Sequence, residues 1–266
     1  MKKVMTILLA VLMLLSLAAC GGKEEEVNDQ DTQEAERTQL IVGLDDTFAP
    51  MGFRDEGGNL VGFDIDLATA VCEYLGWEVI FQPIDWEAKE MELNNKNIDC
   101  IWNGMSITPE RQQSMSLSKP YLNNRLVIMC NEGIVVSSKE DLANLKIGTQ
   151  AQSAALETMQ ADDVWESIKD NVSEYRSYDE VILDMQAGRI DVMVVDEVLG
   201  EYKNSKLDKK FSVSDVDFGD DLYAIGFRKE DTALTKQVED AIDALIANGK
   251  AAEISEKWFG KNIVIG

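Results

Sequence analysis

Short apolar runs alternate with amphipathic stretches along most of the chain. β-Branched and aromatic residues dominate the runs, which predicts buried strands at 39–44, 77–82, 98–102, 126–130, 145–149, 190–195 and 222–227. Between the runs, apolar residues recur at helical spacing, which predicts helices at 64–75, 153–159, 232–247 and 254–258. Asp64 and Asp231 are the predicted N-caps of two of these helices. Alternating strands and helices with short loops indicate an α/β fold, with mostly parallel sheets flanked by helices.

Polar residues stand where several predicted strands end. Asp45 and Asp196 each follow such a strand, as do Asn103-Gly104 and the loop after Thr149. Parallel sheets bind ligands at the carboxyl ends of their strands. The pattern therefore predicts a ligand-binding α/β protein, and by itself it goes no further.

The chain begins with a short cationic segment and an apolar run from Val4 to Leu17. The run is too short for a stable bilayer span but fits a secretory signal peptide, predicted at 1–19. The tetrapeptide Leu17-Ala18-Ala19-Cys20 resembles the bacterial lipobox, in which the cysteine is lipidated and the signal is cleaved just before it. This resemblance implies a lipid anchor, with palmitate, at Cys20.

Residues 20–38 are predicted to form a disordered acidic tether. The stretch is rich in Asp and Glu, and Val27 is its one large aliphatic residue. Such a sequence cannot bury enough apolar surface to fold.

The composition excludes several classes of function. The 266 residues include 25 Lys+Arg, 49 Asp+Glu and no histidine, for a formal net charge of −24. Without histidine there is no Ser-His-Asp triad, no Cys-His pair and no zinc site with imidazole ligands. The negative charge argues against nucleic acid, because binding a polyanion relies on clustered Lys and Arg. No cofactor and no metal site are predicted.

The cysteines beyond Cys20 are Cys72, Cys100 and Cys130, an odd number that cannot all pair. Two interpretations stay open. The thiols are small buried hydrophobic side chains, or two of them form a disulfide and one is free.

Four stretches of the chain occur in a specific order and spacing. They are Gly43-Leu-Asp-Asp-Thr-Phe-Ala-Pro50, Gly62-Phe-Asp-Ile-Asp-Leu67, Gly104-Met-Ser-Ile-Thr-Pro-Glu-Arg111 and Ile254 to Gly260. Together they resemble family 3 of the bacterial extracellular solute-binding proteins, the amino-acid receptors of ABC importers. The resemblance implies a two-lobed, periplasmic-binding-protein-like (type II) fold with a hinge of two crossing segments. It assigns 39–123 plus 222–266 to lobe 1 and 124–221 to lobe 2.

The resemblance also implies a binding site. Arg111 matches the arginine that clamps the ligand α-carboxylate, a task suited to a planar bidentate donor, and Ser106 matches the hydroxyl beside it. The carbonyl oxygen of Gly104 and the carboxylate of Asp196 match the acceptors for the ligand ammonium. Ser153 matches part of the second lobe's cap on the carboxylate, where a helix begins.

One departure concerns that cap. The family usually has Gly followed by two Ser or Thr residues, whereas this chain has Gln152, Ser153 and Ala154. The second hydroxyl is therefore missing.

Three further residues are implied to surround the ligand side chain. Phe48 and Trp86 match two pocket walls, which supply apolar area and, for a cation, cation–π attraction. Asp45 matches the position facing the side chain, which favours a polar or cationic group and disfavours glutamate or aspartate. Glu87 either adds a second negative charge or faces solvent. The predicted order of ligands is a basic amino acid, then glutamine or another polar one, then cystine.

The implied function is capture of a free amino acid by closure of two lobes, followed by delivery to an ABC permease. The implied location is the extracytoplasmic face of the cell membrane, held by the N-terminal lipid, and the implied state is a monomer that is not an enzyme. Two alternatives share the fold: a cyclohexadienyl or arogenate dehydratase, with Glu87 as its candidate carboxylate, and a sensory ligand-binding domain.

Overall fold

A computed structural model describes residues 37–207 and 210–266. The predicted signal peptide at 1–19, the lipidation site Cys20 and nearly all of the tether at 20–38 lie outside the described residues and stay predictions. Within the described ranges, no helix combines the length and the apolar character needed to cross a membrane.

One nine-stranded sheet runs through the described chain in the order β10-β9-β11-β8-β12-β6-β1-β5, with β7 paired to β12. The strands are β1 (Gln39–Leu44), β5 (Glu78–Pro83), β6 (Cys100–Ser106), β7 (Met115–Leu117), β8 (Leu122–Cys130), β9 (Ile147–Gln150), β10 (Val172–Tyr175), β11 (Val192–Asp196) and β12 (Ser212–Arg228). The outer strands pair in parallel, β1 with β5 and β6, and β9 with β10 and β11. The predicted α/β class is confirmed, although β8 and β12 in the middle of the sheet pair antiparallel with their neighbours.

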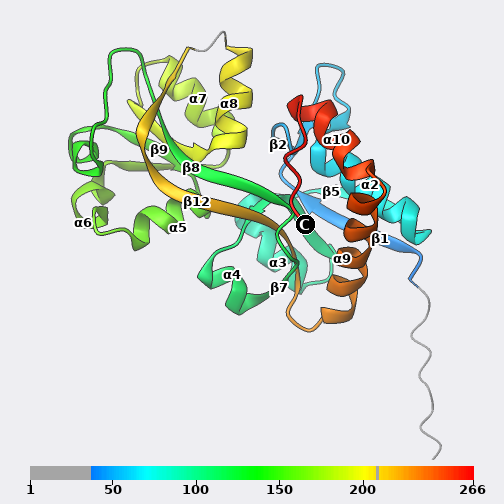
Figure 1. Ribbon diagram of the computed structural model, residues 1–266. Coiled ribbons are helices and arrows are strands. Elements are labelled where there is room, and N and C mark those ends of the chain that lie inside the picture. Colours follow the sequence, from blue (N-terminus) through cyan, green and yellow to red (C-terminus); the bar gives the residue numbers. More distant parts are fainter. Residues whose placement is uncertain (1–36, 208–209) are drawn as a thin grey trace, which may run out of the picture. The chain divides into compact units, whose positions relative to one another are not determined.

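Strands β8 and β12 connect two lobes (Figure 1). The first lobe holds β5, β1 and β6, the second holds β10, β9 and β11, and the two long strands run side by side between them. Small strands β2 (Thr47–Phe48), β3 (Gly52–Arg54) and β4 (Leu60–Val61) form a separate sheet in the first lobe. The first-lobe helices are α2 (Phe63–Leu75), α3 (Lys89–Asn94), α4 (Pro109–Ser114), α9 (Thr232–Ala247) and α10 (Lys250–Phe259). The second-lobe helices are α5 (Ala154–Ala161), α6 (Trp165–Ile168), α7 (Tyr178–Gln186) and α8 (Glu197–Lys206). Short 3-10 turns lie at Trp86–Ala88, Lys139–Asn144 and Lys169–Asn171.

Apolar side chains from the predicted strands form the cores. In the second lobe, Ile128, Ile147 and Val192 are fully buried in one cluster. In the first lobe, Ile98 and Ile101 are fully buried in another. Burial of such side chains stabilises each by about 1.5–3 kcal/mol relative to exposure. Cys72, Cys100 and Cys130 are all free and buried, which confirms the interpretation of these thiols as small buried hydrophobic side chains.

Two predicted helix caps need correction. Helix α2 begins after Gly62, so Asp64 lies inside its first turn and has no capping role. The Asp64 carboxylate is buried and accepts hydrogen bonds from the Gly104 N–H at 2.7 Å and the Tyr121 hydroxyl at 2.9 Å. Asp231 does precede α9 but makes no side-chain cap bond, because its carboxylate pairs with Arg228 at 2.6 Å.

Two strands are longer than predicted. Strand β6 continues through Asn103 and Gly104 to Ser106, because its last residues pair with β12. Strand β12 begins at Ser212 instead of Leu222, because its polar first half pairs with β8. Both extensions are long-range pairings that override weak local strand preference.

Candidate functional site

All the predicted ligand-binding residues except Asp45 line one small cavity between the lobes. The lining consists of Phe48, Trp86, Gly104, Ser106, Arg111, Gln150, Ser153, Ala154 and Asp196. The free volume is about 10 Å³, which is room for about one water molecule. The two lobes therefore lie nearly closed on each other at this site.

Strand ends position some of these side chains, and the first turns of helices position others. Strand β6 carries Gly104 and Ser106, and β11 ends at Asp196. Arg111 lies in the first turns of α4, where Thr108 is the N-cap and its hydroxyl accepts the Arg111 N–H at 3.3 Å. Ser153 is the N-cap of α5, and its hydroxyl accepts the Leu156 N–H at 3.1 Å.

The Arg111 guanidinium is 2% exposed and links the two lobes. Its Nη1 donates to the Ser106 carbonyl at 3.1 Å in the first lobe, and its Nη2 donates to Glu157 Oε1 at 2.9 Å in the second. Its Nε is buried and has no hydrogen-bond partner among the described residues. The arginine thus keeps its Nε–H for a group that enters the cavity. Sequence reasoning missed Glu157, which lies one helical turn after the Ser153 cap.

The carbonyl oxygen of Gln152 accepts hydrogen bonds from three side chains of the first lobe. It accepts bonds from Trp86 Nε1 and Lys89 Nζ, each at 3.2 Å, and from Arg111 Nη2 at 3.3 Å. Gln152 has a φ of 52°, a left-handed conformation that favours glycine. A glutamine in this conformation costs about 1–2 kcal/mol in local strain.

Lys89 is a buried cation that sequence reasoning missed. Its side chain is 2% exposed, and its Nζ lies 5.0 Å from the centre of the Trp86 ring. Burial lowers the pKa of Lys89 to about 8, and repulsion from Arg111 adds to the shift. The available signal was its spacing from Trp86, since residues three apart in a helical turn share one face.

Two carboxylates lie close together here, of which Asp196 lines the cavity and Asp221 does not. Asp196 Oδ1 accepts hydrogen bonds from Asn124 Nδ2 and from the Tyr223 hydroxyl, both at 2.8 Å. Asp221 Oδ2 accepts bonds from the Ser106 hydroxyl at 2.7 Å and from the same Asn124 nitrogen at 2.8 Å. Burial raises the pKa of both carboxyl groups, and the neighbouring charge of Asp221 raises that of Asp196 further. Asn124 and Asp221 were not predicted.

Asp45 lies one side chain away from the cavity. Its Oδ1 accepts bonds from the Thr47 N–H at 2.9 Å and the Thr47 hydroxyl at 2.7 Å, and its Oδ2 accepts Gln150 Nε2 at 2.8 Å. Gln150, which was not predicted, belongs to the second lobe and lines the cavity itself. Burial raises the pKa of Asp45. Glu87 is exposed, which fits the interpretation that it faces solvent.

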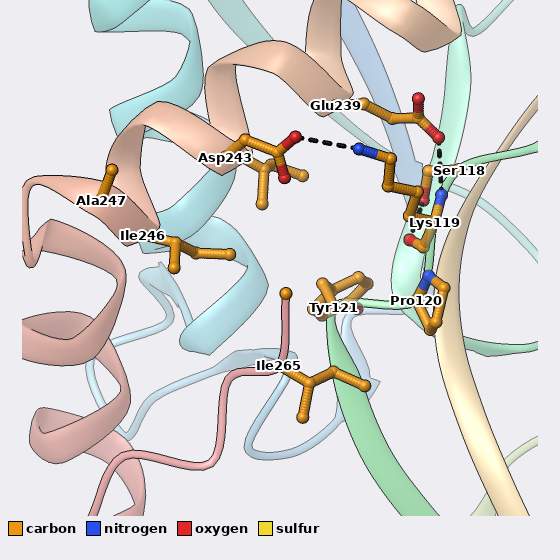
Figure 2. A pocket seen from close by; sticks show the side chains of 11 residues that line it. Ser118, Lys119, Pro120, Tyr121, Glu239, Asp243, Ile246, Ala247 and Ile265 are labelled. Atoms are coloured by element: carbon orange, nitrogen blue, oxygen red, sulfur yellow. Dashed lines mark hydrogen bonds and ion pairs between the residues drawn. The ribbon is translucent and has the colours of Figure 1, made fainter.

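A larger pocket of about 350 Å³ lies in the first lobe between α9 and the C-terminal residues, and it shares no residue with this site (Figure 2). Its walls are mainly apolar side chains such as Ile242, Ile246 and Ile265. Lys119 closes one side through an ion pair with Asp243 at 2.9 Å.

Comparison with known proteins identifies the family. The model of the bacterial extracellular solute-binding proteins, family 3, matches residues 40–261. The L-cystine-binding protein of Escherichia coli strain K12 is 30% identical over 235 residues, which are 86% of this chain and 85% of that protein. The arginine-binding extracellular protein of Bacillus subtilis strain 168 is 25% identical over 97% of this chain and 98% of its own length.

A solved structure supports the same family assignment. An ABC uptake transporter substrate-binding protein from Streptococcus pneumoniae, with bound histidine, superposes with a TM-score of 0.81. It is 36% identical in sequence, and the match covers 86% of this chain and 95% of that one. The chain belongs to the bacterial extracellular solute-binding proteins, family 3.

Proposed function

We propose that this protein is the substrate-binding component of an ABC importer for a basic or polar amino acid. The observation that carries the proposal is the enclosed inter-lobe cavity whose lining includes both the cation Arg111 and the carboxylate of Asp196. An α-amino acid presents the complementary pair of charges. Of the relatives described above, two are named for cystine and for arginine, and the solved structure holds bound histidine.

The ligand α-carboxylate binds between the Arg111 guanidinium and the N-terminal end of α5, where Ser153 contributes its hydroxyl. The α-ammonium binds to Asp196 and the Gly104 carbonyl. Phe48 and Trp86 form the walls along the side chain. Strand ends and helix caps of both lobes supply these groups, so the site is complete only when the lobes are together.

The side chain of the ligand points toward Asp45 and Gln150. A cationic side chain that reaches Asp45 Oδ2 takes the place of the Gln150 amide, which now donates to that oxygen at 2.8 Å. A glutamate or aspartate side chain meets electrostatic repulsion there. A basic amino acid is therefore the first choice, followed by glutamine or another polar amino acid, and then cystine.

Binding requires the lobes to separate, because a cavity of about 10 Å³ cannot admit an amino acid. We place the lobe boundaries at 39–123 plus 222–266 and at 124–221. Both boundaries fall on β8 and β12, the strands that connect the two groups of parallel strands. The closed form is what the permease recognises, and the lipid on Cys20 keeps the monomer at the extracytoplasmic membrane surface.

The dehydratase alternative finds no support in the site. Its candidate carboxylate, Glu87, is exposed and does not line the cavity. The proteins matched above are named as binding proteins, and none of the proposed contacts breaks a bond in the ligand.

A thermal-shift screen of the common amino acids with ornithine, citrulline and cystine tests the proposal, with calorimetry on each hit. We expect the tightest binding for arginine, lysine or ornithine. Tightest binding of glutamate or of an aliphatic amino acid would contradict the assigned ligand class. Conversion of prephenate or arogenate to a product would favour the enzyme instead.

A further inference from the structure

Two neighbouring carboxyl groups, one of which lines the cavity, face the single positive charge of the proposed ligand ammonium. Asp196 and Asp221 are 4% and 9% exposed, and both accept a bond from the same Asn124 nitrogen at 2.8 Å. Their oxygens therefore lie within the ~6 Å over which one buried carboxylate disfavours ionisation of the other. Two full charges in this position are unfavourable.

The surrounding groups do not balance this pair of charges. Arg111 faces both carboxylates, but its Nη2 is already paired with Glu157 at 2.9 Å. The other titratable groups that face Asp196 are the neutral phenols of Tyr178 and Tyr223.

On its open side, Asp221 borders a groove of about 570 Å³. The charged residues of this groove are Arg125, Glu197 and Asp220. Arg125 pairs with Asp217 and with Glu197, so it supplies no cation to Asp221.

The same site carries independent signs of a ligand. Arg111 Nε is buried and unpartnered among the described residues, and its side chain lines the cavity. Asp196 Oδ1 has two protein donors, while none of the hydrogen bonds of the described residues uses its Oδ2. A donor that enters the cavity can reach this second oxygen.

We propose that Asp196 and Asp221 hold one proton between them and that the ligand ammonium displaces it on binding. This inference rests on the proposed function. In the step, the carboxyl O–H bond of the pair breaks, the proton leaves to solvent along the groove beside Asp221, and the ammonium keeps its own protons. Both carboxylates are then charged, balanced by the ammonium and by Asn124.

The proposal makes ligand binding proton-linked. Below the pH at which the pair loses its proton, the affinity for the ligand rises with pH, because fewer protons compete with the ammonium for the two carboxylates. The limit for one released proton is a tenfold gain per pH unit. Above that range the affinity becomes flat.

The test is calorimetry with the best amino acid from the screen, at about pH 6, in two buffers that differ in ionisation enthalpy. We expect the wild-type protein to release up to about one proton per ligand bound, and Asp221→Asn to bind while releasing clearly fewer. Asp220→Asn is the matched control, because Asp220 is the exposed neighbour whose carboxylate accepts no hydrogen bond from Asn124, and it should behave as wild type.

The outcomes separate the two proposals. Binding with the same enthalpy in both buffers, or Asp221→Asn that releases as many protons as wild type, would overturn proton displacement and leave the proposed function standing. If no amino acid binds, both fail. If Asp221→Asn does not fold, the wild-type protein still decides, because a pH-independent affinity between about pH 5 and pH 7 would overturn the inference.

Discussion

Asp45 is the residue that the proposed ligand class depends on most directly. Its Oδ1 is held by two bonds from Thr47, which leaves Oδ2 for the Gln150 amide or for a ligand cation. In Asp45→Asn the Thr47 contacts can persist, but the negative charge is gone. We therefore predict that affinity for arginine or lysine falls about 10- to 100-fold, the value of one hydrogen bond to a charged group.

Calorimetry with arginine and glutamine distinguishes this effect from general damage. Glutamine affinity should change much less than arginine affinity, since a neutral side chain loses no ion pair. Asp46→Asn is the control, because Asp46 pairs with Arg54 at 2.6 Å outside the cavity. An equal loss for both ligands would mean that Asp45 supports the fold of the site and does not select the side chain.

Residues that follow a recognisable strand end or motif could be predicted, and their cross-lobe partners could not. Arg111, Ser106 and Asp196 stand at such positions, and the structure brings them to one cavity. Gln150 contacts Asp45 across 105 positions of sequence, and Asp221 contacts Ser106 across 115. No periodicity or spacing encodes such pairings: the first forms between the two lobes, and the second follows from the pairing of β6 with β12.

Among the elements, helix α5 links stability to binding through its first turn. Ser153 caps the helix by accepting the Leu156 N–H at 3.1 Å, and it also lines the cavity. We predict that Ser153→Ala lowers the free energy of unfolding by about 1 kcal/mol, the usual effect of losing an N-cap. Ser153→Ala should also weaken amino-acid binding, because the Ser153 hydroxyl is the one hydroxyl left at this helix start, where the next residue is Ala154.

Helix α7 provides the matched control. Ser177 caps it by accepting the Glu180 N–H at 3.4 Å and does not line the cavity. Ser177→Ala should therefore lose stability in chemical denaturation without changing ligand affinity measured by calorimetry. Weakened binding in both variants would show that general loosening of the second lobe explains the effect, and not the hydroxyl of Ser153.

The bounds of strands and helices differ from the predicted ones where long-range contacts override the local sequence pattern. The run of apolar residues ends at Trp102, yet β6 extends to Ser106 because Ser106 pairs with Tyr223 of β12. At α2, an acidic residue near a helix start resembles a cap, but Asp64 is drawn inward to the Gly104 N–H and Tyr121. The local sequence around Asp64 is compatible with a helix cap and with a buried acceptor, so only the packed structure distinguishes the two roles.

At the scale of the whole molecule, contacts between the lobes set how far the protein closes before a ligand arrives. Arg111 of the first lobe pairs with Glu157 of the second at 2.9 Å, and both side chains are largely shielded from water. Arg176 pairs with Asp85 across the same gap, but that pair is exposed and contributes little. Arg111–Glu157 is therefore the charged contact with the larger effect on closure.

Removal of this contact should shift the population of the ligand-free protein toward the open form. We predict that Glu157→Gln has a larger radius of gyration than wild type in solution scattering without ligand. At saturating ligand the two should be equal, because the bound carboxylate then bridges Arg111 and the N-terminal end of α5. Glu166→Gln is the control, since Glu166 is 80% exposed on α6 and pairs only within its own lobe. If Glu157→Gln matches wild type both with and without ligand, the ion pair does not hold the lobes together, and ligand-free closure must rest on the contacts to the Gln152 carbonyl instead.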